Sequence, residues 1–406
     1  MKKGDYMLKG PFLKASEIIK NIEANGHQAY FVGGCVRDLL LGHPIGDVDI
    51  TTSAPPTVVQ KIFDDVIPVG IEHGTVIVRH ENESYEITTF RVEGQYSDHR
   101  HPDSVEFIDQ IDKDLERRDF TINALAMDLN GQIMDLFAGK ADLQAKVIRT
   151  VGDGDTRFVE DPLRIIRALR FSSQLGFSIE EETLKAIDRV KPKIQTIAIE
   201  RITTEFNKLV QGNYVNNGIH YLKRMRIDHY LPVFSDNKGL IEKLPNNLKP
   251  LESIAELFAL LHYVDPSIDV HTWFKAWKCS NRVRKEANDL SNAIFNFSRN
   301  GINLWLVYQL PVEYHARFIR LVSILLPNKF ISMDQMEAYT HRLPIRSKRE
   351  LEINGNDLIA LHPTLPKGPW IQKLLNQIEY LVVMGKLENN RTKLKEWIKW
   401  NPPEIN

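Results

Sequence analysis

Residues 30–52 read YFVGGCVRDLLLGHPIGDVDITT, an apolar run, two adjacent glycines and, further on, two aspartates separated by one valine. The apolar run 30–32 predicts a short strand, and residues 37–41 predict a short helix closed by Gly42. Residues 47–52 alternate polar and apolar side chains, which is the pattern of a strand with one buried face. Residues 30–52 therefore predict a small strand–helix–strand unit, which indicates mixed α/β structure.

The two aspartates of this unit, Asp47 and Asp49, are expected on one face of the second strand, roughly 6–7 Å apart along it. Carboxylates held so close repel each other unless a cation lies between them, and oxygen ligands suit Mg²⁺. Gly33 and Gly34 let the backbone approach a phosphate, while Arg37 and the helix N-terminus supply positive charge. The two glycines alone could form an ordinary turn, and the two aspartates alone could belong to a solvated strand. Together they indicate nucleoside triphosphate chemistry.

The motif formed by residues 33–38 and 46–49 resembles the signature motif of the class II tRNA nucleotidyltransferase and bacterial poly(A) polymerase family. The resemblance extends from about residue 28 to residue 210. It implies an α+β fold, with an N-terminal polymerase beta-like nucleotidyltransferase head of mixed β-sheet followed by an all-α neck, body and tail. We expect the head, neck, body and tRNA-binding tail to cover residues 1–150, 151–212, 213–300 and 301–406.

Composition is that of a globular protein with more than one domain, since 43% of the 406 residues are hydrophobic and 26% are charged. No apolar run resembles a signal peptide or reaches transmembrane length, so no membrane partner is expected. The two cysteines form no disulfide framework, which suits a reducing cytoplasm. Residues 1–150 contain 16 Lys and Arg against 24 Asp and Glu, whereas residues 151–406 contain 36 against 29. A basic rear part is compatible with RNA binding.

Glu86 is the candidate for a third carboxylate. It lies in the β-prone segment 85–91, which we expect beside the strand that carries the aspartates. An exposed glutamate on an edge strand is the alternative. The wider polymerase-beta-like superfamily often has a third strand carboxylate, so the resemblance assigns Asp47, Asp49 and Glu86 to a catalytic site for Mg²⁺. Two metal ions there would activate the attacking 3′-hydroxyl and stabilise the pyrophosphate leaving group.

A second motif lies at residues 117–126, RRDFTINALA. The pattern predicts a helix in which Asp119 and Asn123, four residues apart, share a face. Arg118 near the N-terminus of that helix would oppose the helix dipole, so an anionic partner is expected for it. The run resembles the second motif of the family, in which such residues hold the triphosphate and test for a ribose 2′-hydroxyl.

The third motif is residues 160–170, EDPLRIIRALR. Asp161 before Pro162 predicts the start of a helix, and this capping role alone would explain the aspartate. It does not explain Arg164, a cation in the first turn, where the helix dipole disfavours it.

Arg164, Arg167 and Arg170 repeat every three residues, and a solvated basic face is the ordinary explanation for such a stripe. The E-D-x-x-R pattern, however, resembles the motif by which these enzymes choose the incoming base. Asp161 can accept from the exocyclic amine of cytosine or adenine, and Arg164 can donate to the adjacent ring acceptor. Guanine and uracil have the opposite polarity and would leave buried charges unpaired. The pair would therefore admit CTP and ATP and reject GTP and UTP.

The resemblance and this chemistry imply addition of C, C and A to the 3′ end of tRNA from CTP and ATP, with release of pyrophosphate. A poly(A) polymerase with the same head and a CC-only relative are the nearest alternatives. A non-catalytic RNA-binding protein with a dead transferase head is an alternative of another class. The implied partners are tRNA, ATP and CTP, and the sequence leaves open whether the chain is a monomer or a homodimer.

Residues 92–104 are polar and long for a connection between strands, so they are either disordered or functional. A single Asp161–Arg164 pair must accept CTP twice and then ATP, and the two bases differ in size. The pair must therefore shift after the second addition. The resemblance places a flexible loop that acts as a lever between the first two motifs, and Asp98 and Arg100 are its charged candidates.

We expect that shortening residues 94–102, or replacing Asp98 and Arg100 by Ala, leaves C addition largely intact and impairs the final A. Steady-state rates for CTP on a tRNA lacking CCA, and for ATP on a tRNA ending in CC, measure the two steps separately. Equal loss of both rates, or of neither, would leave an ordinary loop.

Overall fold

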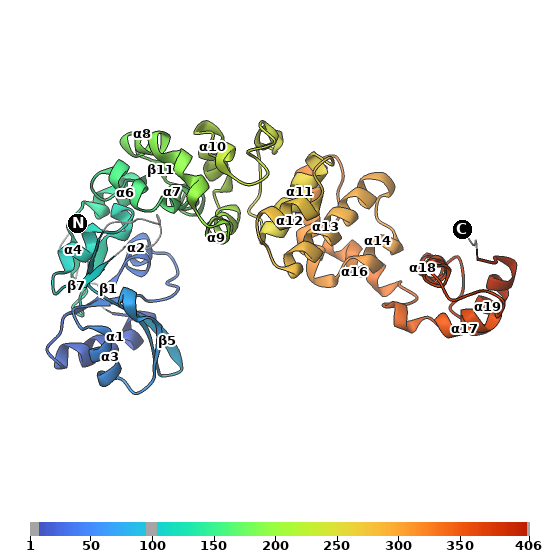
Figure 1. Ribbon diagram of the computed structural model, residues 1–406, viewed down its shortest axis with the longest axis horizontal. Helices are drawn as coiled ribbons and strands as arrows, with labels where there is room; N and C mark the ends of the chain where they lie inside the picture. Colours follow the sequence, from blue (N-terminus) through green and yellow to red (C-terminus); the bar gives the residue numbers. More distant parts are fainter. Residues whose placement is uncertain (1–7, 95–103, 404–406) are drawn as a thin grey trace. The chain divides into compact units, whose positions relative to one another are not determined.

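The computed structural model describes residues 8–94 and 104–403 (Figure 1). The chain divides into two compact units, residues 1–242 and 243–406. The first unit contains a mixed β-sheet followed by helices, and the second unit is helical. This confirms the expected fold class, while the finer division into head, neck, body and tail stays a prediction. No helix in the described part of the chain is long and apolar enough to span a membrane.

A seven-stranded sheet forms the centre of the first unit, in the order β3-β4-β5-β2-β1-β8-β9. β2 and β5 run parallel, whereas the other neighbouring pairs are antiparallel. The parallel pair places β5 directly beside β2, as expected for the strand that carries Glu86. The strands are β1 (Ala29–Val32), β2 (Ile50–Thr52), β3 (Val66–Gly70), β4 (Thr75–His80), β5 (Glu83–Thr89), β8 (Leu125–Met127) and β9 (Ile133–Asp135).

The first strand–helix–strand unit forms as the sequence predicts, with one shift. Helix α2 (Gly34–Leu41) begins directly after β1 and ends at Gly42, whose φ of 69° suits a residue without a side chain. β2 begins only at Ile50, so the two aspartates precede the strand instead of lying in it. The alternation nevertheless persists, since Asp47 and Asp49 are exposed while the residues between and after them are buried. The N–H of Val32 donates to the carbonyl of Asp49 at 3.0 Å, which anchors the pair beside β1.

The helix expected over residues 117–126 is wrong. Helix α4 (Ile111–Glu116) ends before it, and a 3₁₀ turn, η2 (Thr121–Asn123), leads into β8. The carboxylate of Asp119 accepts from the N–H of Phe120 and from the Asn123 amide, and such local bonds compete with helix formation. Burial of Leu125 and its neighbours in the sheet also favours a strand over a helix in this segment. Arg118 thus follows the C-terminus of α4, where the dipole favours a cation, so the dipole argument for an anionic partner does not hold.

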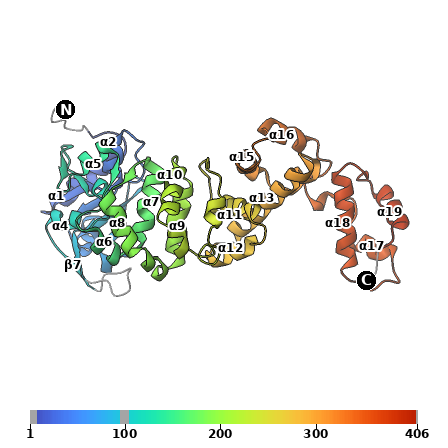
Figure 2. The ribbon, with the colours of Figure 1, turned by 90° about the horizontal axis from the view of Figure 1, so that it is seen from above.

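After residue 150 the first unit is mainly helical, and helix α7 lies at its centre. It packs against α9 and α10, and much of its surface is buried. Figure 2 shows α7, α8, α9 and α10 as neighbours. The predicted start of the helix is shifted by one residue, because Pro162 and not Asp161 is the N-cap of α7; Asp161 follows the end of α6 and accepts from the N–H of Leu163 at 3.1 Å. The helices are α6 (Gly154–Glu160), α7 (Leu163–Leu175), α8 (Glu181–Val190), α9 (Ile199–Val210) and α10 (Val215–Arg224).

The remaining elements of the first unit surround the sheet and connect it to these helices. The antiparallel ribbon of β6 and β7 stands apart from the main sheet, and β10 pairs with β11 in parallel. The bounds are α1 (Pro11–Ala24), α3 (Pro56–Ile62), β6 (Arg91–Glu93), β7 (Val105–Phe107), α5 (Gly139–Ala145), β10 (Val147–Ile148) and β11 (Ser178–Ile179).

The second unit has aromatic and aliphatic cores. Phe258 stacks on Trp273 with ring centroids 5.6 Å apart, and Trp277 packs edge-on against the same ring at 6.0 Å. Another cluster surrounds Ile378 and Leu394 near the C-terminus. The helices are α11 (Ile254–Val264), α12 (Val270–Ala276), α13 (Asn281–Asn300), α14 (Leu304–Gln309), α15 (His315–Leu325), α16 (Met333–His341), α17 (Gly355–Leu361), α18 (Trp370–Val383) and α19 (Arg391–Trp400).

Candidate functional site

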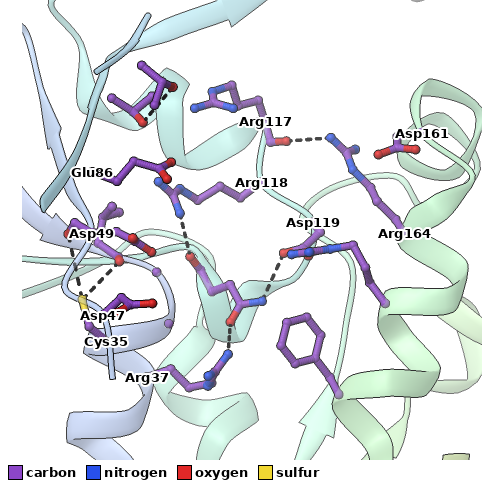
Figure 3. A pocket seen from close by; sticks show the side chains of 18 of the residues that line it. Cys35, Arg37, Asp47, Asp49, Glu86, Arg117, Arg118, Asp119, Asp161 and Arg164 are labelled. Carbon is purple, nitrogen blue, oxygen red and sulfur yellow. Dashed lines mark hydrogen bonds and ion pairs between the residues drawn. The ribbon is translucent and has the colours of Figure 1, made fainter. Parts of the chain in front are cut away.

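A cavity of about 830 Å³ opens in the first unit, between the β1–β2–β5 side of the sheet and helices α7 and α9 (Figure 3). Every candidate residue of the sequence analysis that lies in the described part of the chain lines it. Asp98 and Arg100 lie outside the described residues. The candidates that line the cavity are Gly33, Gly34, Arg37, Asp47, Asp49, Glu86, Arg118, Asp119, Asn123, Asp161, Arg164, Arg167 and Arg170.

Three carboxylates occupy one side of the cavity, as Figure 3 shows. Asp47 and Asp49 come from the segment that leads into β2, and Glu86 comes from β5, whose register pairs Ile87 with Ile50. Loss of water in the cavity and the neighbouring Glu86 and Asp47 raise the pKa of Asp49 to about 6, although Arg118 acts in the opposite direction. The three carboxylates therefore concentrate negative charge in the cavity, which a bound cation would neutralise.

The oxygens of these carboxylates are not all in contact distance of one ion. Among the described residues, the group whose ligand atoms lie within 4.8 Å of one another is Glu17, His80 and Glu81, which are outside the cavity. Asp47, Asp49 and Glu86 would have to draw together or hold an ion partly through water. Mg²⁺ commonly keeps several water ligands, so the oxygen-only donor set fits that ion.

The turn between β1 and α2 leaves room for the side chain of Arg118. Gly33 has a φ of 76°, and a Cβ atom there would lie 2.9 Å from Nη1 of Arg118. The Nε of Arg118 is buried and has no hydrogen-bond partner in the described part of the chain. A buried donor of this kind is costly to leave unpaired. A phosphate oxygen is a suitable acceptor for it.

Arg37 is less available than the sequence analysis assumes. Its Nε donates to Asp38 at 2.9 Å, and its Nη1 donates to the side-chain oxygen of Asn123 at 2.7 Å. The guanidinium also lies 5.3 Å from the centre of the Phe171 ring. Arg37 is thus held by protein contacts and supports Asn123, which it orients toward Asp119.

Asp161 and Arg164 line the same cavity, but their side chains are held by different partners (Figure 3). Asp161 accepts from Nη2 of Arg201 on α9 at 2.8 Å. Arg164 donates to Glu160 at 2.8 Å and to the backbone carbonyl of Arg117 at 3.1 Å. Both side chains are therefore fixed in orientation by neighbours. Arg201 is a site residue that the sequence analysis missed.

The remaining arginines of α7 are paired and largely shielded from water, which excludes a solvated basic face. Arg167 lies 2.6 Å from Asp119, and Arg170 lies 3.1 Å from Glu205 of α9 and 4.0 Å from the ring centre of Phe171. Burial acts to raise the pKa of Asp119, but Arg167 and the Asn123 amide hold it down at about 2. Asp119 is thus a carboxylate throughout the physiological range.

Glu205 was also missed. It and Arg201 lie four residues apart on α9; Arg201 lines the cavity, whereas Glu205 is not among the lining residues but pairs with Arg170, which is. The spacing of opposite charges on one helix face was a signal that could have been used. It would have placed the two residues together, but not beside α7.

Comparisons with known proteins identify families that match most of the chain. Residues 29–149 match the poly A polymerase head domain family, and residues 176–237 match the family of the RNA- and SrmB-binding site of polymerase A. Residues 249–398 match the tRNA nucleotidyltransferase domain 2 family. The three matched segments follow one another along both units.

The similarity to individual proteins extends over almost the whole chain. The CCA-adding enzyme of Oceanobacillus iheyensis is 50% identical over 98% of this chain and 100% of its own length. That of Bacillus mycoides is 40% identical over 96% of this chain and 98% of its own length. The crystal structure of the Bacillus stearothermophilus CCA-adding enzyme in complex with CTP has a TM-score of 0.86 and 35% identity, and covers 97% of this chain and 98% of that one.

Replacing Gly33 by Ala is expected to weaken CTP binding at least tenfold, because the new Cβ would displace Arg118. The matched control is Gly42→Ala, which also has a positive φ but nothing within 4 Å of the new atom. Gly42→Ala should lose about 1–2 kcal/mol of unfolding free energy, because φ 69° and ψ 23° lie in the left-handed region, and Gly33→Ala should lose more, because φ 76° and ψ −125° lie outside the regions allowed to residues with a side chain. Thermal unfolding and equilibrium dialysis with CTP measure the two effects. Equal CTP binding by both variants would contradict the role given to this turn.

Proposed function

This chain belongs to the CCA-adding enzyme family, and from that premise we propose that its cavity adds C, C and A to the 3′ end of tRNA. CTP and ATP supply the nucleotides, and pyrophosphate leaves. The observation that carries the proposal is that three carboxylates, a buried arginine donor and the oriented side chains of Asp161 and Arg164 line one cavity. The full-length similarity favours this activity over a poly(A) polymerase, a CC-only relative or a dead transferase head.

Asp47, Asp49 and Glu86 would hold the divalent metal that the family uses, which we propose is Mg²⁺. Their shared side of the cavity and their oxygen-only chemistry support this assignment. A divalent cation bound there would lower the pKa of the 3′-hydroxyl of the tRNA and offset negative charge on the leaving pyrophosphate.

Arg118 and the turn at Gly33 would bind the triphosphate. The unpartnered Nε of Arg118 supplies a donor, and Gly33 allows backbone and phosphate to approach closely. Asp119 and Asn123 would meet the ribose, because the Asp119 carboxylate is held in its charged form and oriented by the Asn123 amide. Such contacts would hold the α-phosphate near the carboxylates without reference to the base.

Asp161 and Arg164 would choose the base. A carboxylate oxygen accepts from the amine that cytosine and adenine share, and a guanidinium donates to the ring nitrogen beside it. Arg201 and Glu160 hold the two side chains in place before the nucleotide arrives, so little ordering is left for the binding step. Uracil and guanine would place an acceptor opposite the Asp161 carboxylate and a donor opposite the Arg164 guanidinium.

The helical part of the chain would bind the tRNA. Residues 151–406 contain 36 Lys and Arg against 29 Asp and Glu, and residues 249–398 match a tRNA nucleotidyltransferase domain. A net positive charge favours association with a phosphate backbone. We place this work in the cytoplasm, where tRNA and a reducing environment occur together, and we leave the oligomeric state open.

Asp47→Asn or Asp49→Asn is expected to reduce incorporation of both C and A at least about 100-fold, since even residues that merely orient a metal ligand contribute about 10- to 100-fold. Each variant keeps the side-chain shape, so folding and tRNA binding should persist. Asp64→Asn, an exposed aspartate of the same unit, is the control. Incorporation of labelled CTP and ATP at several Mg²⁺ concentrations gives the readout. Near wild-type rates in either variant would remove it from the metal site.

Asp161→Ala and Arg164→Ala are expected to lower the preference for CTP over UTP about tenfold or more, because hydrogen bonds to charged groups contribute about 1.5–3 kcal/mol. Arg189→Ala, which removes an exposed arginine of α8, should keep wild-type selectivity. The ratio of kcat/KM for the two nucleotides measures the effect. If both variants select as the wild type does, helix capping is a sufficient account of Asp161.

A further inference from the structure

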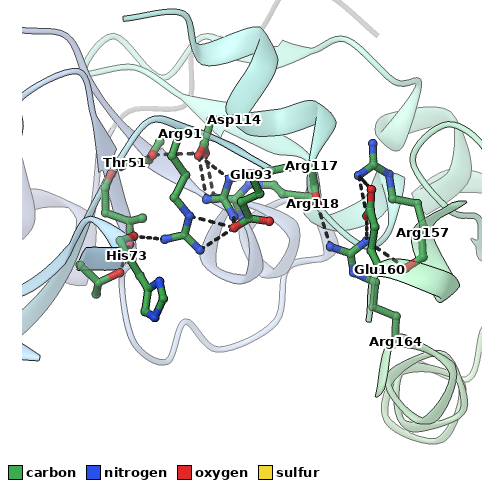
Figure 4. Close-up of polar contacts among 12 residues, drawn as sticks. Thr51, His73, Arg91, Glu93, Asp114, Arg117, Arg118, Arg157, Glu160 and Arg164 are labelled. Atoms are coloured by element: carbon green, nitrogen blue, oxygen red, sulfur yellow. Dashed lines mark hydrogen bonds and ion pairs between the residues drawn. The ribbon is translucent and has the colours of Figure 1, made fainter. Parts of the chain in front are cut away.

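Arg117 connects two parts of the first unit because its backbone and its side chain have different partners (Figure 4). Its carbonyl accepts from Nη2 of Arg164 at 3.1 Å. Its guanidinium donates to Glu93 on β6 at 3.0 Å and to Asp114 on α4 at 2.7 Å. One residue thus touches the base-selecting arginine at one end and a group of buried carboxylates at the other.

These carboxylates are shielded from water. The side chain of Asp114 is 0% exposed and that of Glu93 is 7% exposed. Asp114 accepts also from the hydroxyl of Thr51 on β2, and Glu93 pairs also with Arg91 at 2.8 Å. A buried ion pair is costly to break, since it leaves an uncompensated charge. The guanidinium of Arg117 is therefore held firmly, and its own peptide group lies a few bonds away.

The carbonyl of Arg117 completes the set of acceptors around Arg164. The others come from the end of α6, namely the Glu160 carboxylate at 2.8 Å and the Arg157 carbonyl at 3.1 Å. Both accept from Nη1, whereas the Arg117 carbonyl accepts from Nη2. A planar guanidinium bound at both terminal nitrogens has a fixed plane. Contacts at Nη1 alone would let the group swing about that end.

We propose that Glu93 is a positioning residue for base selection. By holding the side chain of Arg117, Glu93 fixes the peptide carbonyl that orients the Arg164 guanidinium toward the base. This inference rests on the proposed role of Arg164, and adds to it a residue on the β6–β7 ribbon. Arg118 also contacts Asp114 at 3.5 Å, so the same network borders the triphosphate side.

A purely structural role for this network predicts something different. If the Glu93–Arg117 pair stabilised the fold alone, weakening it would lower the unfolding temperature and leave the choice of nucleotide unchanged. A positioning role changes the choice of nucleotide in folded protein. The two accounts are therefore separated by selectivity measured beside stability.

The test uses Glu93→Gln in the full chain, which keeps the side-chain shape and removes the charge. Glu106→Gln is the matched control, because Glu106 is exposed on β7 of the same ribbon. Equilibrium dialysis gives Kd for CTP and UTP, and thermal unfolding gives stability. We expect the Kd ratio of UTP to CTP to fall on the order of three- to tenfold in Glu93→Gln, which lies within the range found for coupled neighbours, and to stay at the wild-type value in Glu106→Gln. An unchanged ratio in folded Glu93→Gln overturns the proposal.

A double-mutant cycle identifies the route. In the Arg164→Ala background, Glu93→Gln should cause no further change in the ratio, and an equally large change there would overturn action through Arg164. If Glu93→Gln does not fold, Arg117→Lys takes its place, because it keeps a cation beside Asp114 and loses the forked geometry. Binding needs no catalysis, so the cycle is informative whether or not tRNA is extended. Failure of the wild type to add C and A to tRNA would count against the proposed function alone.

Discussion

The ion pair between Asp119 and Arg167 is the contact on which the site depends. It joins the segment before β8 to helix α7, and so fixes the sheet against the helices that follow it. Asp119 is 7% exposed, and a carboxylate buried to that degree without a cation would cost several kcal/mol. Arg170 and Glu205 repeat the arrangement between α7 and α9. These ion pairs thus fix the position of α7, which forms one wall of the cavity, relative to the sheet and to α9.

The wall of the cavity that carries the three carboxylates differs from the wall formed by α7. Asp47, Asp49 and Glu86 come from adjoining segments of one sheet, where loss of water is the main cause that raises the pKa of Asp49 and the carboxylates of Glu86 and Asp47 add to it. On the α7 wall the arginines are paired with carboxylates of the protein, whereas on the other wall the negative charge of the carboxylates would be neutralised by a bound cation. Rigid positioning and the proposed metal site thus lie on different walls, and a triphosphate with its cations would lie between them.

Short-range patterns were the predictable part of this structure. Two glycines, one alternating run and one β-prone segment were enough to place Glu86 beside the aspartates. The helix expected over 117–126 does not form. Hydrogen bonds of Asp119 with Phe120 and Asn123 outweigh helix propensity, and β8 pairs with β1 in the sheet. The partners of the arginines could not be predicted, since Arg201 and Glu205 approach α7 only through packing of helices distant in sequence. Spacing identifies which residues carry charge, but not which charges meet.

The proposed selection of two bases by Asp161 and Arg164 requires both order and the capacity to shift. The acceptors that hold Arg164 differ in this respect. Glu160 accepts through its side-chain carboxylate, whereas Arg157 and Arg117 accept through backbone carbonyls. Rotation of the peptide group between Arg117 and Arg118 would break the backbone bond in which the Arg118 N–H donates to the carbonyl of Leu115 at 3.3 Å. The Glu160 carboxylate can therefore move by side-chain rotation alone, while the two carbonyls, and the buried carboxylates that hold the Arg117 side chain, keep any change in the guanidinium plane limited.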